Sequence, residues 1–133
     1  MREIKFWGRR PNGEWIHGAL IPAEYSWWGV PSIADKNFRY EVDPETIGQY
    51  TGVYDSEENP VYEGDIIHFL HRKKFETGVV HYTNGAFRVK NRVNLRHDHL
   101  GTVAMFNQIH VIGNIHDNPE LMVYKEGKER AGS

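Results

Sequence analysis

Apolar residues along this chain occur in short, alternating runs that are separated by glycine, proline and asparagine. No run keeps a helical period of 3.6 residues over ten positions. A period of two is typical of strands that bury one face and expose the other. The sequence therefore predicts a mostly β protein with little helix.

Two Asn-Gly pairs, each between alternating runs, predict β-hairpins. The first hairpin is expected over residues 4–21 with its turn at Asn12-Gly13, and the second over residues 78–90 with its turn at Asn84-Gly85. Asn-Gly pairs readily adopt the positive φ angles of a tight turn. The second hairpin has the stronger signal because both of its flanking runs are rich in β-branched and aromatic residues.

The second strand of that hairpin predicts a sheet with two unlike faces. Successive side chains of a strand point to opposite sides. Phe87 and Val89 should therefore lie on one side, and Arg88 and Lys90 on the other. One face is expected to pack and the other to be basic.

The β-rich segment 62–115 predicts a small, SH3-like, partly open β-barrel of about five strands in the C-terminal half. An N-terminal hairpin and an irregular excursion over residues 21–37 precede it. The excursion has no clear period and carries Trp27 and Trp28. Whether these two side chains are buried or exposed does not follow from the sequence.

The length of 133 residues suits one domain. We expect that domain to span residues 1–123. A proline following Asn118 predicts one helical turn near its end. The charged run that follows predicts a disordered tail over residues 124–133.

The chain has no cysteine, which excludes disulfide frameworks, thiol nucleophiles and cysteine-ligated zinc sites. No apolar run is long enough for a signal peptide or a membrane-spanning helix. These features predict a cytoplasmic protein of a bacterial host with no membrane partner.

A formal net charge of −2 conceals two opposed blocks of charge. Residues 41–65 contain no lysine or arginine. Their acidic residues are Glu41, Asp43, Glu45, Asp55, Glu57, Glu58, Glu63 and Asp65. Residues 68–100 are predominantly basic and include five histidines. The blocks predict either mutual neutralisation within one molecule or contact between subunits, where complementary charge fixes orientation.

Four strings in the chain carry a family resemblance. They are MREIKF at 1–6, PETIGQYTG at 44–52, VYEGDII at 61–67 and VIGNIHDNPEL at 111–121. In this order they resemble the YopX-type phage and prophage proteins over nearly the whole chain. Trp7 and His116 depart from the pattern, and residues 22–40 and 92–108 match little.

The resemblance implies a phage or prophage origin, a β fold of its own type and no established biochemical activity. It supplies no catalytic residue. The shared glycines and tyrosines are typical of turns and buried anchors, and so favour an architectural role for these strings. A binding cleft lined by some of their carboxylates is the competing hypothesis.

A metal site is a weaker hypothesis. His97 and His99 are two residues apart, so on a strand they would share a face and could both ligate zinc. A third ligand, such as His81 or His110, would have to come from elsewhere. The alternative is that these histidines are simply solvated, and we expect no cofactor.

An enzyme with an unrecognised carboxylate or histidine site is a further alternative. Asp43 and Glu45 flank Pro44 and are more typical of a turn than of an acid and base pair. The chain has no phosphate-binding glycine loop, nucleophile elbow or His-Glu-x-x-His helix. We therefore expect no catalysis.

The basic block suggests a surface for single-stranded nucleic acid, with cations along the phosphates and aromatic rings stacked on bases. Tyr82 and Phe75 are the candidate stacking rings. The predicted binding residues are Arg72, Lys73, Lys74, Tyr82, Arg88, Lys90, Arg92 and Arg96.

The same charges also suit a protein partner or self-association, for which Trp7, Trp15, Trp27 and Trp28 are candidate anchors. Our interpretation is a non-catalytic accessory protein that binds a macromolecule and forms a homo-oligomer. The macromolecule would be a nucleic acid or a phage or host protein.

Overall fold

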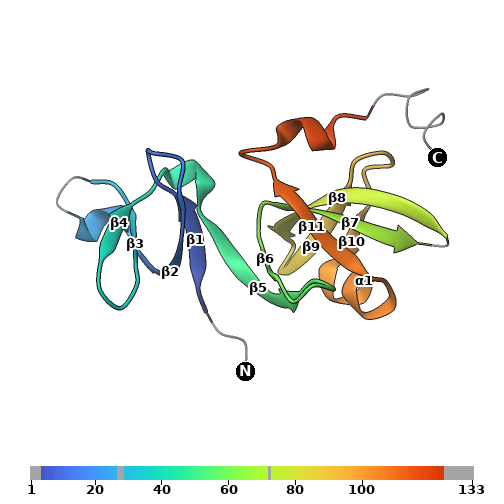
Figure 1. The fold of residues 1–133 in the computed structure, drawn as a ribbon, viewed down its shortest axis with the longest axis horizontal. Coiled ribbons are helices and arrows are strands. Elements are labelled where there is room, and N and C mark those ends of the chain that lie inside the picture. The colour runs from blue at the N-terminus through green and yellow to red at the C-terminus, as the bar shows by residue number, and fades with distance from the viewer. Residues whose placement is uncertain (1–3, 27–28, 72, 125–133) are drawn as a thin grey trace. The chain divides into compact units, whose positions relative to one another are not determined.

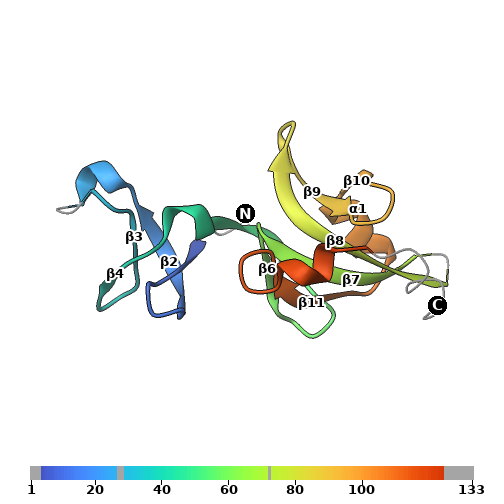
Figure 2. The ribbon, with the colours of Figure 1, turned by 90° about the horizontal axis from the view of Figure 1, so that it is seen from above.

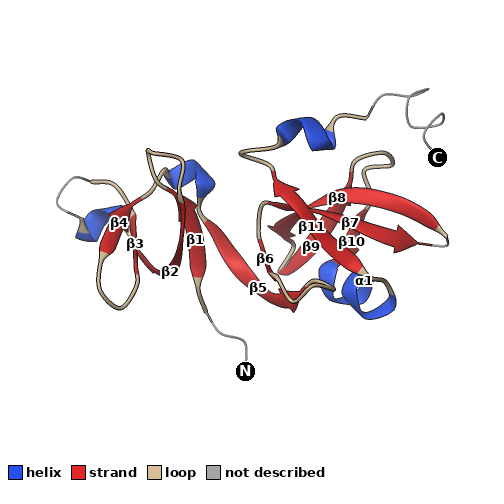
Figure 3. Cartoon of the chain, in the orientation of Figure 1, coloured by secondary structure: helices blue, strands red, loops and turns tan. Residues whose placement is uncertain are grey.

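The computed structural model describes residues 4–26, 29–71 and 73–124. Strands predominate among them (Figure 3), which confirms the predicted mostly β class. The chain divides into two compact units, with the boundary between Gly52 and Val53. A single domain over residues 1–123 stays a prediction, and the predicted disordered tail, residues 124–133, lies outside the described residues except for Tyr124.

The first unit is an antiparallel sheet with the strand order β4-β3-β2-β1-β5. β5 continues past the boundary between the units. The strands are β1 (Phe6–Arg9), β2 (Trp15–Ile21), β3 (Ser32–Ala34), β4 (Arg39–Glu41) and β5 (Gly48–Tyr54). Two 3₁₀ helices, η1 (Ala23–Tyr25) and η2 (Pro44–Thr46), connect them.

The first predicted hairpin is confirmed, but its turn differs from the expected one. The Arg10 amide donates to the Glu14 carbonyl, and the Gly13 amide to the Arg10 carbonyl. Gly13 has a φ of 90°, whereas Asn12 is not at positive φ. Asn12 instead accepts the Glu14 amide with its side chain at 3.0 Å. The longer loop thus needs only one left-handed residue.

Aromatic rings pack the first hairpin. The ring centroids of Trp7 and Trp15 lie 4.1 Å apart, nearly parallel, and Trp7 is buried. The predicted excursion over residues 21–37 contains η1 and β3, and Trp27 and Trp28 lie outside the described residues. Asp43 caps η2 by accepting the Glu45 amide, as the turn interpretation of this segment predicts.

The second unit contains an antiparallel sheet with the order β10-β9-β8-β7-β11 (Figure 1). β6 (Pro60–Tyr62) neighbours the end of β5 that lies in this unit. The five strands are β7 (Asp65–His71), β8 (Lys74–Thr83), β9 (Ala86–Asn91), β10 (His97–His99) and β11 (Ile109–Asn114). Asn84 and Gly85 turn β8 into β9 with φ angles of 50° and 81°, which confirms the second predicted hairpin.

The five-stranded sheet is not closed into a barrel. β10 and β11 are its two edges, and the helix α1 (Leu100–Phe106) covers one face between them. We call this face the inner face. Its core consists of Val61, Ile67, Phe69, Val80, Val89, Leu100, Val103 and Ile109. A helix thus covers apolar side chains that a closed barrel would bury inside.

The opposite, outer face is partly covered by the 3₁₀ helix η3 (Pro119–Met122), which packs against β8. Figures 1 and 2 show α1 and η3 on opposite sides of the sheet. η3 confirms the helical turn predicted near Pro119. Asn118 does not cap it with its side chain, which accepts the Asn114 amide instead. Among the described helices, none is long and apolar enough to cross a membrane.

Candidate functional site

The candidate site is on the outer face of β8, β9 and β10. In β9, Val89 is 1% exposed and belongs to the inner core. Its neighbours Arg88 and Lys90 therefore point to the outer face, as the alternation in the sequence predicts.

The strand register brings histidines from both sides to these two cations. Arg88 lies between His81 of β8 and His99 of β10, and Lys90 lies beside His97 of β10. We call the set His81, Arg88, Lys90, His97 and His99 the basic face. The acidic residues described in these three strands, Glu76 and Asp98, alternate to the inner side.

Two imidazole rings of the basic face meet above β9. His97 Nδ1 and His81 Nε2 are 2.8 Å apart, within hydrogen-bonding distance, and the ring centroids are separated by 4.8 Å. Burial lowers the pKa of His81, and the nearby charges of His97, Lys90 and Arg88 lower it further. His81 is therefore biased toward its neutral form, in which an unprotonated Nε2 can accept a hydrogen bond from His97 Nδ1.

The predicted binding residues do not form one surface. Lys73 and Lys74 are exposed at the turn between β7 and β8, where Lys73 has a φ of 64°. The basic face is near the other end of β8. Lys74 and Thr83 are nine residues apart on this strand, a separation of about 30 Å at ~3.3 Å per residue. Arg72 lies outside the described residues.

Arg92 and Tyr82 also lie outside the basic face. Arg92 donates from Nη1 to the Leu121 carbonyl at 2.9 Å and so ties η3 to the end of β9. Tyr82 alternates to the inner side, where its ring meets Phe87 edge-on at 5.1 Å, although 54% of Tyr82 is exposed. Neither side chain is part of the basic face.

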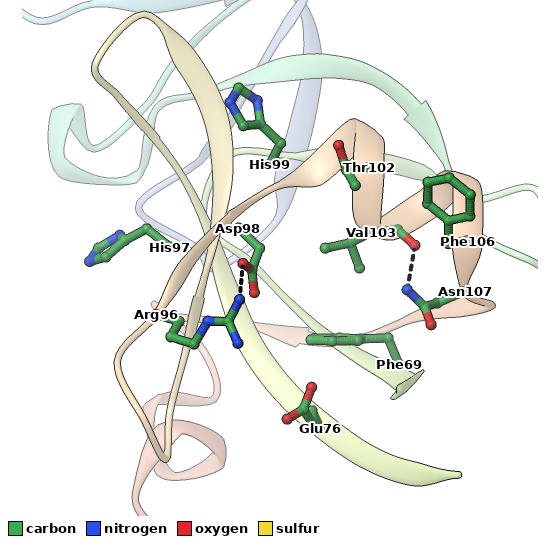
Figure 4. A pocket seen from close by; sticks show the side chains of 10 residues that line it. All are labelled: Phe69, Glu76, Arg96, His97, Asp98, His99, Thr102, Val103, Phe106 and Asn107. Carbon is green, nitrogen blue, oxygen red and sulfur yellow. Dashed lines mark hydrogen bonds and ion pairs between the residues drawn. The ribbon is translucent and has the colours of Figure 1, made fainter. Parts of the chain in front are cut away.

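Arg96 lies at a groove of about 610 Å³ beside α1 (Figure 4). Its guanidinium pairs with Asp98 at 3.3 Å, and Asn107 donates to the Val103 carbonyl at 3.0 Å. The groove is lined by Phe69, Glu76, Arg96, His97, Asp98, His99, Thr102, Val103, Phe106 and Asn107. Figure 4 shows Asp98 directed into the groove and His97 away from it. The groove thus combines opposite charges, whereas the basic face gathers one sign.

The structure brings His81, one of the two candidate third ligands, to His97 without forming a metal-binding arrangement among the described residues. His97 and His99 share a face, as predicted, and His81 reaches His97. Arg88 and Lys90 lie between the two histidine-bearing strands and disfavour a bound cation. In the described part of the chain, no group of three or more histidine, aspartate or glutamate side chains is arranged to hold a metal ion.

Sequence reasoning treated His81 and His97 only as possible metal ligands and missed their pairing. They are 16 residues apart, and only the register of β8, β9 and β10 brings them together. The detectable signal was alternation, because Arg88 and Lys90 flank Val89 while His97 and His99 flank Asp98, so each pair shares a face of its strand.

Carboxylates of the acidic block serve local architecture. Asp55 accepts the amides of Glu57, Asn59 and Val111. Asp65 is buried and accepts the Tyr62 amide at 2.8 Å. Burial raises the pKa of Asp65 to about 7, and the charge of Asp55 contributes to the rise.

One solved structure with a similar fold is the crystal structure of protein EF1440 from Enterococcus faecalis, with a TM-score of 0.57. The two sequences are 22% identical over 92% of this chain and 100% of that chain. No curated protein matched the sequence. The family model described as YopX protein matches residues 19–123, most of the chain. This chain therefore belongs to the YopX family.

Proposed function

We propose that this protein is a non-catalytic module that binds single-stranded nucleic acid on the basic face. One observation carries the proposal: the register of β8, β9 and β10 gathers two long cations and three imidazoles on one side of the sheet. The acidic residues described in these strands alternate to the other side. A surface of one sign attracts a polyanion and steers its approach.

The residue types favour a single strand over a duplex. Arg88 and Lys90 can follow phosphates, and imidazole rings can stack on or hydrogen-bond to bases. Bases are accessible to such rings only when they are unpaired. The face is also small, since three strands span about 10 Å at ~4.8 Å per step, which suits a few nucleotides.

The test is fluorescence anisotropy with labelled single-stranded DNA, single-stranded RNA and duplex DNA at several salt concentrations. The variant Arg88→Glu with Lys90→Glu should bind single strands at least about tenfold more weakly and show a smaller salt dependence. Lys73→Glu with Lys74→Glu is the matched control, because it changes the same charges at the other end of β8. Circular dichroism of each variant establishes that it folds.

Single-strand binding that both double variants weaken equally would contradict the assignment to the basic face. Absence of binding at low salt, where phosphate contacts are strongest, would overturn the proposal. Tighter binding of duplex DNA would contradict the proposed role of unpaired bases.

A second candidate function is self-association, the homo-oligomer predicted from the sequence. Leu70 and Phe75 are cross-strand partners at the end of the β7–β8 hairpin, and they are 40% and 62% exposed. Exposed apolar pairs of this kind favour contact with another protein surface. Light scattering on the wild type and on Phe75→Ser tests this candidate, since only an oligomer held by this pair dissociates in the variant.

The phage or prophage origin, the cytoplasmic location in a bacterial host and a phage or host protein partner also stay proposals. They derive from the sequence and the family resemblance. The binding experiments above are independent of all three.

A further inference from the structure

We infer that the His81–His97 pair couples nucleic-acid binding on the basic face to proton uptake, so that the protein binds single strands more tightly in mildly acidic solution. This inference rests on the proposed function and specifies how the site is regulated. It starts from the geometry of the pair. The backbones of β8 and β10 are two strand spacings apart, about 10 Å, and the two rings reach across β9 to meet.

The hydrogen bond between the rings limits how many protons they hold. A contact of 2.8 Å between Nδ1 of His97 and Nε2 of His81 has room for one hydrogen. If both rings were imidazolium ions, both nitrogens would carry hydrogen and the bond would be lost. The hydrogen-bonded pair therefore carries at most one positive charge.

The surroundings oppose a second proton in the free protein. Arg88 and Lys90 face the pair from β9, and His99 shares its side of the sheet from β10. Burial lowers the pKa of His81, and the charges of His97 and of both basic side chains of β9 lower it further. Asp98 is on the other side, where it pairs with Arg96. η3, which packs against β8, has one charged residue, the exposed Glu120.

A bound phosphate would favour the second proton on the His81–His97 pair. Negative charge between Arg88 and Lys90 would offset the repulsion that keeps the second proton off the pair. The doubly protonated rings would separate, and each freed N–H would donate to a phosphate oxygen as a charge-assisted hydrogen bond. Binding would then take up about one proton. By linkage, affinity rises by up to about tenfold for each pH unit lowered within the titration range of the pair.

The experiment measures the dissociation constant for a fluorescent oligothymidylate without terminal phosphates at pH 5.5, 6.5 and 7.5 and constant ionic strength. Thymine does not titrate in this range, so a change reports on the protein. The wild type should bind at least about tenfold more tightly at pH 5.5 than at pH 7.5. Calorimetry in two buffers of different ionisation enthalpy should show uptake of close to one proton at pH 6.5.

His81→Gln with His97→Gln removes the pair but retains Arg88 and Lys90, and should reduce the pH dependence to about threefold or less. His110→Gln is the matched control, because it removes a histidine from β11 outside the basic face and should keep the wild-type slope. Circular dichroism at each pH establishes that every variant is folded.

The outcomes separate the inference from the proposed function. Binding that is equally tight at all three pH values would overturn the inference and leave single-strand binding intact. A double variant with the wild-type slope would overturn the assignment to this pair. Absence of binding at every pH would overturn the proposed function together with the inference.

Discussion

The two faces of the five-stranded sheet are built from the same strands yet have opposite chemistry. The inner face holds the apolar core that α1 covers, and Val80 and Val89 there are each 1% exposed. On the outer face, His81, Arg88 and Lys90 are direct neighbours of those valines in the chain, and His97 and His99 lie beside them on β10. The difference shows that one strand can contribute to the core and to a charged surface at once, because successive side chains point to opposite faces.

The largest effect is expected from moving a charge from one face to the other. Val89→Asp would place a carboxylate in the inner core, and we expect it to lower the free energy of unfolding by about 4 kcal/mol or more. Arg88→Asp, one residue away on the outer face, should cost less than about 1 kcal/mol. Urea denaturation followed by circular dichroism measures both. Equal costs would contradict the division into a buried core face and a basic outer face.

Asp65, a buried carboxyl group on the inner side, is expected to make stability depend on pH. It alternates to the inner side with Ile67, and burial raises its pKa to about 7 from an ordinary value of 3.8. Between these values the native state holds a proton that the unfolded state lacks. Stability should therefore fall as the pH rises from about 4 to 7, by an amount on the order of a few kcal/mol.

Asp65→Asn should flatten this dependence, as measured by urea denaturation at a series of pH values. His81 on the outer face acts in the opposite sense. The pKa of His81 is lowered in the folded state, so below about pH 6.5 the unfolded chain binds more protons than the folded one. The contribution of His81 to stability therefore falls as the pH drops below about 6.5. A stability profile of Asp65→Asn that still declines steeply from pH 4 to 7 would contradict the assignment to Asp65.

Gly78 tests how closely the inner face is packed. A Cβ atom there would lie 2.5 Å from Val89 Cγ1 and 2.8 Å from the Lys90 carbonyl oxygen. Gly78→Ala should lower the free energy of unfolding by about 1–3 kcal/mol. Gly101→Ala is the control, because nothing lies within 4 Å of its Cβ position and alanine favours the helix α1. Thermal denaturation distinguishes the two, and a neutral Gly78→Ala would indicate a looser core.

The smallest effect is expected where the outer face is tied down by η3. Arg92→Ala removes the hydrogen bond to the Leu121 carbonyl and should lower the free energy of unfolding by about 1–2 kcal/mol. Arg96→Ala removes an exposed ion pair with Asp98 and should cost less than about 0.5 kcal/mol. Proteolysis of the C-terminal segment should accelerate in Arg92→Ala only. Equal rates in the two variants would contradict an anchoring role for Arg92.

The β class, both hairpins and the two faces of β9 were predictable from the amino-acid sequence alone. These features depend on local patterns: a period of two sorts Val89 from Arg88, and Asn84-Gly85 supplies the positive φ angles that a tight turn requires. The family was also readable, because its strings are contiguous in the chain. Local energetics suffice for the β class, the hairpins and the two faces of β9.

Which charges lie together became visible only in the folded protein. The basic block looked continuous along the chain, but the extended geometry of β8 carries Lys74 far from Arg88, and Arg92 was committed to η3. His81 and His97 met only through the register of three strands, and α1 covered the inner face in place of barrel closure. The physical reason is that strand pairing and packing depend on contacts between residues distant in sequence, for which no local pattern carries a signal.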